Sequence, residues 1–245
     1  MERNEYLQMA KLEERMWWFR ATHEFLLFVL HRSQSESLRP LLDAGCGTGG
    51  FLYRLAQSSL ASDAIGIDLS AEAVAIAKDK SKVPVSIGTV DQVPFANGSC
   101  STIVSIDTIC HRFVDPEAAA REANRCLAVG GICVIHVPAY EWLRSYHDEH
   151  GYTARRYTRR GLQRLLNRAG FRVTYCTYRV CLLFPLMVLR RKVFKRKDDS
   201  SDVVDYPPMV DSLFTFVMDI ELLLFRLGIR FPFGGSVVAV GMKDG

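Results

Sequence analysis

The chain has 245 residues, of which 49% are hydrophobic and 24% are charged. This length allows one large α/β domain to bury a substantial core without crosslinks, so we expect residues 1–245 to form a single folding unit. The formal net charge of +4 is spread along the chain, and nucleic acid is therefore not an expected partner.

The cysteines and the N-terminal residues bear on the cellular compartment. The seven cysteines form no C-x-x-C pair and no spacing typical of zinc sites, so we expect reduced, mostly buried thiols and no metal site. Glu2, Glu5, Glu13 and Glu14 precede the first apolar run, which is wrong for a signal peptide. The sequence therefore predicts a cytoplasmic protein.

The first helical segment is predicted at residues 4–33, where apolar residues recur at helical spacing. We expect this segment to form one or two helices, broken near Trp17-Trp18-Phe19. We expect residues 1–37 to form a helical cap in front of the core.

From Leu41 onward, short apolar runs that end in small or acidic residues alternate with helical stretches. The strands are expected at residues 41–43, 64–68, 83–87, 102–106 and 132–137. The helices between them are expected at residues 51–56, 71–80 and 116–126. This alternation is typical of βαβ units, and it predicts a parallel sheet in an α/β core over residues 38–180.

The last part of the chain adds a helix at residues 158–169, a strand at 171–180 and a final strand within 236–245. Residues 181–235 form an insertion far longer than the usual connection between strands. Its helix, at residues 209–227, places a set of apolar residues on one face: Leu213, Phe216, Val217, Ile220, Leu224 and Leu227. Charges on the other face argue against a membrane span, which leaves a substrate cap, a dimer face or a membrane-surface contact, in that order of preference.

The strongest motif is the glycine-rich segment that follows the first strand. Gly45, Gly47 and Gly50 satisfy G-x-G-x-x-G, and Asp68 follows the second strand 19 residues beyond Gly49. This is the distance at which a Rossmann fold places a carboxylate against ribose hydroxyls. A nicotinamide-dependent oxidoreductase is therefore one reading of the motif. Asp43 favours S-adenosylmethionine (SAM) over a dinucleotide. A carboxylate at this position would repel a pyrophosphate, but it can help to bind the cationic amino-acid end of SAM.

With these motifs, the chain resembles class I SAM-dependent methyltransferases over residues 41–137 and again at the last two strands. The resemblance implies a Rossmann-like, seven-stranded, mostly parallel sheet with the last strand antiparallel. It also implies SAM as cofactor. The residues that it assigns to the methionine part of SAM are Asp43, Gly45, Cys46 and Gly47.

The resemblance assigns further cofactor contacts. Asp68 would bind the ribose hydroxyls and Leu69 would pack on adenine. The segment Gly88 to Phe95 resembles G-D-A-E-x-L-P-F, so Thr89 and Val90 stand where the family recognises adenine. Asp107 lies in the stretch after the fourth strand that faces SAM, although Cys110 replaces the usual glutamate there.

A narrower resemblance joins the two ends of the chain to a bacterial subgroup of small-molecule or cell-envelope methyltransferases. It is based on Trp17-Trp18-Phe19-Arg20, His147-Asp148 and Arg155-Arg156-Tyr157-Thr158. The subgroup often has Gly-His shortly before the Arg-Arg-Tyr, whereas this chain has Tyr152-Thr153.

Methyl transfer is an in-line displacement, so the protein mainly has to align the acceptor and exclude water. A general base assists a hydroxyl acceptor, and the candidates are His111, His147 and Tyr140, which follow the fourth and fifth strands. Three other histidines are expected to be structural: His23, His31 and His136.

The predicted function is methyl transfer from SAM to a small-molecule or lipid-like acceptor, most often at an oxygen. The alternatives are an NAD(P)-dependent oxidoreductase and a catalytically inactive SAM-binding partner subunit. A peripheral membrane contact and a homodimer both stay open as further interactions.

Overall fold

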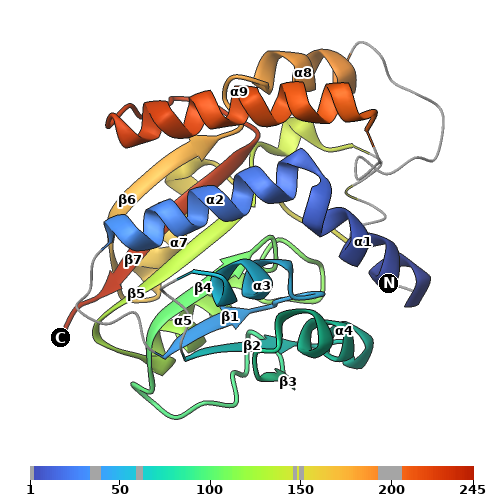
Figure 1. Cartoon of the computed structure of the whole chain (residues 1–245). Coiled ribbons are helices and arrows are strands. Elements are labelled where there is room, and N and C mark those ends of the chain that lie inside the picture. The colour runs from blue at the N-terminus through green and yellow to red at the C-terminus, as the bar shows by residue number, and fades with distance from the viewer. Residues whose placement is uncertain (1–2, 34–39, 59–62, 146–147, 149–151, 193–205) are drawn as a thin grey trace.

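The computed structural model describes residues 3–33, 40–58, 63–145, 148, 152–192 and 206–245. A seven-stranded sheet runs through its centre in the order β3-β2-β1-β4-β5-β7-β6 (Figure 1). The strands are β1 Leu41–Ala44, β2 Ala64–Asp68, β3 Val85–Ile87, β4 Cys100–Ile106, β5 Leu127–Pro138, β6 Phe171–Arg179 and β7 Ser236–Lys243. The pairs from β3 to β5 are parallel, and β7 is antiparallel to both of its neighbours. The predicted Rossmann-like sheet is confirmed.

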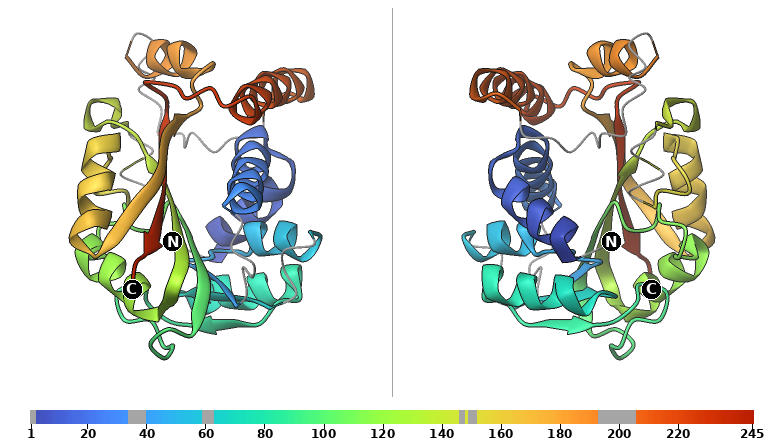
Figure 2. Two further views of the ribbon diagram at one scale, coloured as in Figure 1. Left: turned by 90° about the vertical axis from the view of Figure 1, so that its left-hand side faces the viewer. Right: turned by 90° about the vertical axis from the view of Figure 1, so that its right-hand side faces the viewer.

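Helices cover both faces of this sheet (Figure 2). One face packs against α2 (Trp17–Arg32), α3 (Gly50–Ala56) and α4 (Ala71–Ser81). The opposite face packs against α5 (Pro116–Cys126) and α7 (Arg159–Arg168). The central strands are therefore buried on both sides, which is why their sequences are nearly continuous apolar runs. All seven cysteines are buried thiols, as predicted.

Side-chain caps begin three of these helices. Ser70 Oγ accepts a hydrogen bond from Ala73 N at the start of α4. Asp115 accepts from two backbone amides at the start of α5, and Thr158 does the same for one amide of α7. Each cap satisfies a backbone donor that the first turn of a helix leaves free.

The N-terminal segment forms two helices, as predicted, with the break at Met16 between α1 (Arg3–Arg15) and α2. Met16 supplies no side-chain cap for α2. The backbone amide of Trp17 instead donates to Asp211 Oδ1 at 2.8 Å, from the far end of the chain. The start of α2 is thus fixed by the insertion.

The insertion carries two helices, α8 (Phe184–Lys192) and α9 (Pro208–Arg226), which lie at the same end of the molecule in Figures 1 and 2. Because β6 and β7 are adjacent antiparallel strands, the insertion leaves and re-enters the sheet at one edge. In α9 the buried residues are Met218, Glu221 and Phe225. In the described part of the chain, no helix is long and apolar enough to cross a bilayer.

Candidate active site

The glycine-rich segment forms a tight loop between β1 and α3. The backbone amides of Gly45 and Cys46 both donate to Ile67 O at 2.9 Å, which ties the loop to β2. Gly45, Gly47 and Gly49 have φ values of 84°, 53° and 81°. A Cβ at Gly45 would also collide with the Thr108 side chain. The loop can therefore adopt this path only with glycine at these positions.

Asp68 joins this loop to the next helix. Its Oδ2 accepts from Gly47 N and its Oδ1 accepts from Ser70 N, both at 2.9 Å. The carboxylate is half-buried at the carboxyl end of β2, and the neighbouring Leu69 is 64% exposed. The structure therefore brings together Asp68, Leu69 and the loop glycines, which the sequence analysis had grouped in one cofactor site.

Asp43 is a buried carboxyl group at the end of β1. The residue is 1% exposed, and neither carboxyl oxygen has a hydrogen-bond partner among the described residues. Burial, together with the nearby charges of Asp68 and Glu13, raises its pKa to about 8. A buried acid without partners is costly unless a cation or donor compensates it.

Glu13 of α1 closes the other side of the loop, a contact that the sequence analysis missed. Its Oε2 accepts from Thr48 Oγ1 at 2.6 Å and from Lys80 Nζ at 3.1 Å. Burial raises the pKa of this carboxyl group, and Lys80 opposes the rise. A Cβ added at Gly50 would meet the Glu13 side chain. The only signal in the sequence is an acid in an amphipathic helix, which does not identify the partner.

The remaining predicted cofactor residues lie close to this loop along the same edge. Thr89 forms an isolated bridge with Gln92, and Val90 is buried. Cys46 is also buried, and burial raises the pKa of its thiol. Their assignment to SAM stays a prediction.

Asp107 follows β4 and lies beside a histidine that the sequence analysis expected to be structural. Asp107 Oδ1 is 3.1 Å from His136 Nδ1, and Asp107 N donates to His136 O at 2.9 Å. The histidine is fully buried and touches the Trp18 ring edge to face, whereas the Asp107 side chain is 31% exposed. Asp107 has a φ of 51°, a strained conformation for a non-glycine residue. His136 therefore holds the Asp107 carboxylate at the carboxyl edge of the sheet.

Arg179 ends β6 on the same face of the sheet. Its guanidinium lies 4.7 Å from the centre of the Phe25 ring and donates through Nη2 to Ala21 O at 2.9 Å. Its Nε and Nη1 are buried and have no hydrogen-bond partner in the described part of the chain. Nothing in the sequence pattern distinguished this arginine from the others.

The three candidate bases have different surroundings. His111 is half-buried in the turn after β4, where its backbone forms a bridge with Thr153. Tyr140 stacks on Tyr178 at 5.2 Å in an aromatic cluster under α8, and burial raises its pKa. His147 lies outside the described residues. The structure thus places His111 just after the carboxyl end of β4, whereas Tyr140 packs against the insertion.

Two of the arginines after β5 have structural contacts. Arg156 forms a buried ion pair with Asp148 at 2.8 Å. Arg155 Nη1 donates to the backbone oxygens of His111 and Val114 at 2.9 and 2.8 Å. These side chains hold the loops after β4 and β5 together.

The family comparison agrees with this geometry. The model of the Methyltransf_11 family, described as a methyltransferase domain, matches residues 42–135. This chain carries a class I SAM-dependent methyltransferase domain. SAM is the cofactor of this domain, and the narrower bacterial subgroup stays a prediction.

Individual relatives are about 30–34% identical to this chain over the aligned part of the sequence. The chain is 34% identical over 97 residues to an uncharacterized protein, MJ1252, of Methanocaldococcus jannaschii, covering 40% of this chain and 36% of that protein. It is 30% identical over 116 residues to cycloartenol-C-24-methyltransferase 1 of Oryza sativa, covering 44% and 32%. The match thus spans about a third of the length of these relatives.

Solved structures show the same fold over most of the chain. A SAM-dependent methyltransferase of Thermotoga maritima, described as a possible histamine N-methyltransferase, has a TM-score of 0.57 at 20% identity and covers 99% of this chain and 100% of that one. A geranyl diphosphate methyltransferase in complex with SAM has a TM-score of 0.61 at 19% identity, covering 91% and 84%. At these identities the likeness concerns the fold alone.

The residues at the glycine loop fit SAM. SAM carries a sulfonium and an ammonium group, and the partnerless Asp43 carboxyl next to the loop is a site that a cation would compensate. The Asp68 carboxylate already faces the loop and can accept from ribose hydroxyls. We therefore expect the loop, Asp43 and Asp68 to hold the cofactor.

SAM affinity should depend on pH through Asp43. With a pKa of about 8, the carboxyl group is mostly protonated at neutral pH, and a bound cation favours its ionised form. Binding should therefore release a proton, and affinity should rise by up to about tenfold per pH unit toward pH 8 and level off above it. Calorimetric titrations at several pH values, in buffers of different ionisation enthalpy, measure both effects.

The same pKa makes the stability of the free protein fall as the pH rises, whereas SAM affinity increases. Because the folded pKa lies above the unfolded value, the stability due to protonated Asp43 is complete below about pH 4 and is lost as pH rises through about 8. The Asp43→Asn variant should show neither pH effect. An unchanged pH dependence of SAM binding in this variant would exclude Asp43 as its source.

Proposed function

We propose that this chain transfers a methyl group from SAM to a small-molecule or lipid-like acceptor, and that the methylated atom is an oxygen. The observation that carries the proposal is the buried carboxyl group of Asp43, which has no hydrogen-bond partner within the described ranges and lies beside a loop that Asp68 ties to the start of α4. These residues supply what a cationic adenosyl cofactor needs, namely compensating acids and a close backbone approach.

The proposed acceptor side is formed by Asp107, His136 and Arg179. All three residues lie at the carboxyl ends of β4, β5 and β6, the edge at which open α/β sheets bind ligands. The half-exposed Asp107 carboxylate, held by His136, is in a position to accept a proton from an acceptor hydroxyl. Arg179 Nε and Nη1, which have no hydrogen-bond partner among the described residues, would hold an anionic group of the acceptor.

SAM supplies the electrophilic methyl group when it is bound. The protein contributes alignment of the acceptor, removal of a proton at a carboxylate, and exclusion of water by the aromatic residues Trp17, Trp18 and Phe19 of α2, which pack over this region. A hydroxyl acceptor benefits from the base by about 10²- to 10⁴-fold, which is why oxygen is the favoured atom.

Cofactor binding tests the first half of the proposal. We expect SAM and S-adenosylhomocysteine to bind in the micromolar range in calorimetric titrations, and NADH not to bind. Binding of NADH alone would contradict the proposal in favour of an oxidoreductase.

Acceptor screening with methyl-labelled SAM tests the second half. Panels of hydroxyl, carboxyl and amine compounds, including lipids, should give labelled products mainly from the oxygen acceptors. Labelled products from amines alone would refute the oxygen assignment. Tight SAM binding without any transfer would instead indicate a SAM-binding partner subunit.

A further inference from the structure

The outward face of α9 is a continuous row of large apolar side chains. The exposed fractions of these residues run from 38% to 86%. The row consists of Met209, Leu213, Phe216, Ile220, Leu223 and Leu227. At 1.5 Å per residue, the row is about 27 Å long. A contiguous apolar surface of this kind on a folded protein marks an interaction site.

Buried polar contacts fix α9 in this orientation. The Glu221 carboxylate is fully buried and accepts from the backbone amides of Val180 at 2.8 Å and Leu182 at 3.0 Å, and also from Cys181 N. Asp211 accepts from Trp17 N at 2.8 Å. Rotating the helix to bury its apolar row would break these hydrogen bonds and leave the carboxylate of Glu221 without partners. The exposed row is therefore a property of the native fold.

The neighbouring helix α8 is also exposed and apolar, and none of its residues is buried. Leu186 and Leu189 are 49% and 44% exposed. Beside it lies an open apolar groove of about 500 Å³ lined by residues that include Trp142, Phe184 and Phe233. Figures 1 and 2 both show α8 and α9 together at one end of the molecule. Both inserted helices thus present apolar surface to solvent.

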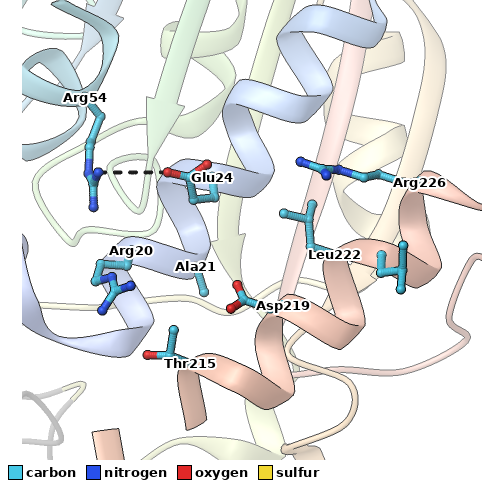
Figure 3. A pocket seen from close by; sticks show the side chains of 9 residues that line it. Arg20, Ala21, Glu24, Arg54, Thr215, Asp219, Leu222 and Arg226 are labelled. Atoms are coloured by element: carbon cyan, nitrogen blue, oxygen red, sulfur yellow. Dashed lines mark ion pairs between the residues drawn. The ribbon is translucent and has the colours of Figure 1, made fainter. Parts of the chain in front are cut away.

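Basic residues outnumber acidic ones around this surface. The last turn of α8 is Arg190-Arg191-Lys192, and Arg230 is exposed just beyond α9. Two acidic residues of α9, Asp211 and Glu221, contact the core. Asp219 is exposed beside the row and, together with Leu223, lines a cavity of about 370 Å³ between α9 and α2 (Figure 3).

We propose that the α8–α9 insertion docks the protein on an anionic membrane surface, with the apolar row of α9 in the interface and the cationic residues on the lipid headgroups. An apolar helix face flanked by Lys and Arg is the composition of interfacial helices, and each basic residue near such a surface adds attraction. A second copy fits less well, because a two-fold interface brings the same cationic residues of both copies together. The inference concerns a surface separate from the glycine loop and is independent of the acceptor.

Vesicle cosedimentation tests the proposal with the full chain. We expect the protein to bind vesicles of phosphatidylcholine mixed with phosphatidylglycerol, to bind pure phosphatidylcholine much more weakly, and to dissociate as salt is raised. The Phe216→Glu variant should bind the mixed vesicles at least roughly 10-fold more weakly than the wild type. Its thermal unfolding should stay close to that of the wild type, because Phe216 is 62% exposed.

Phe113→Glu is the matched control, since Phe113 is 70% exposed but lies in the turn after β4. This variant should bind the mixed vesicles like the wild type. Equal loss in both variants, or no binding of the wild type to anionic vesicles, would overturn the proposal. Light scattering that shows a wild-type dimer and a monomeric Phe216→Glu, without vesicle binding, would assign the surface to a second copy instead.

Discussion

Replacing Gly45 with alanine is expected to weaken SAM binding by at least roughly 100-fold and to destabilise the fold by about 2–5 kcal/mol. Gly45 has a φ of 84°, and an added Cβ would collide with the Thr108 side chain. The left-handed conformation costs about 1–2 kcal/mol for alanine, and overpacking costs about 1–3 kcal/mol. The loop must shift to relieve this strain. If the shift removes two charge-assisted contacts to SAM, the affinity falls by the expected amount.

Gly130→Ala separates the two causes. Gly130 has a φ of 80°, yet no atom lies within 4 Å of the Cβ that alanine would add. This variant should lose only the conformational part, about 1–2 kcal/mol, and bind SAM normally. Urea unfolding and calorimetry of both variants are the measurements. If Gly45→Ala bound SAM as tightly as Gly130→Ala, the loop would not be the cofactor site.

Asp68→Ala is expected to weaken the binding of SAM by roughly 10- to 150-fold. Hydrogen bonds that involve a charged group contribute about 1.5–3 kcal/mol, and this carboxylate also fixes the loop through Gly47 N. The fold should survive, because Ser70 still caps α4. Calorimetric titration with SAM gives the affinity, and circular dichroism gives the state of the fold.

Asp63→Ala provides the control for charge and position. Asp63 is exposed and immediately precedes the opposite, amino end of β2, so its loss removes the same charge without touching the loop. SAM affinity should stay within about twofold of the wild type. Equal affinities for the Asp63 and Asp68 variants would refute the ribose assignment.

The elements that follow from local signals were predicted well from the sequence. β2 and α5 have the predicted bounds, and the remaining strands agree to within about two residues, except that β5 begins at Leu127, well before the predicted start at Ile132. The glycine loop could also be predicted from the sequence, because Gly45, Gly47 and Asp68 belong to one βαβ unit and their spacing reflects that unit. Such features depend on neighbours in the chain, which a single sequence shows.

Features that depend on distant contacts were not accessible in the same way. Glu13 pairs with Thr48 and Lys80, and Glu221 binds the backbone at the end of β6. Neither acid differs in its local pattern from a solvated one. Four residues of the apolar row of α9 were placed on one helix face from the sequence, namely Leu213, Phe216, Ile220 and Leu227. A periodic pattern does not say whether that face lies against the core or in solvent. The buried Glu221, a polar residue on the inner side, decides the orientation.

The docking of Glu13 has a consequence for the order in which the chain can fold during synthesis. The N-terminal helices leave the ribosome first, but Glu13 needs Lys80, and the start of α2 needs Asp211, which is 194 residues away. The attachment of α2 is therefore completed only after α9 has been translated, whereas the contact of Glu13 with the cofactor loop needs no residue beyond Lys80. Nascent chains that stop before α9 should contain the βαβ core but lack the firm attachment of α2.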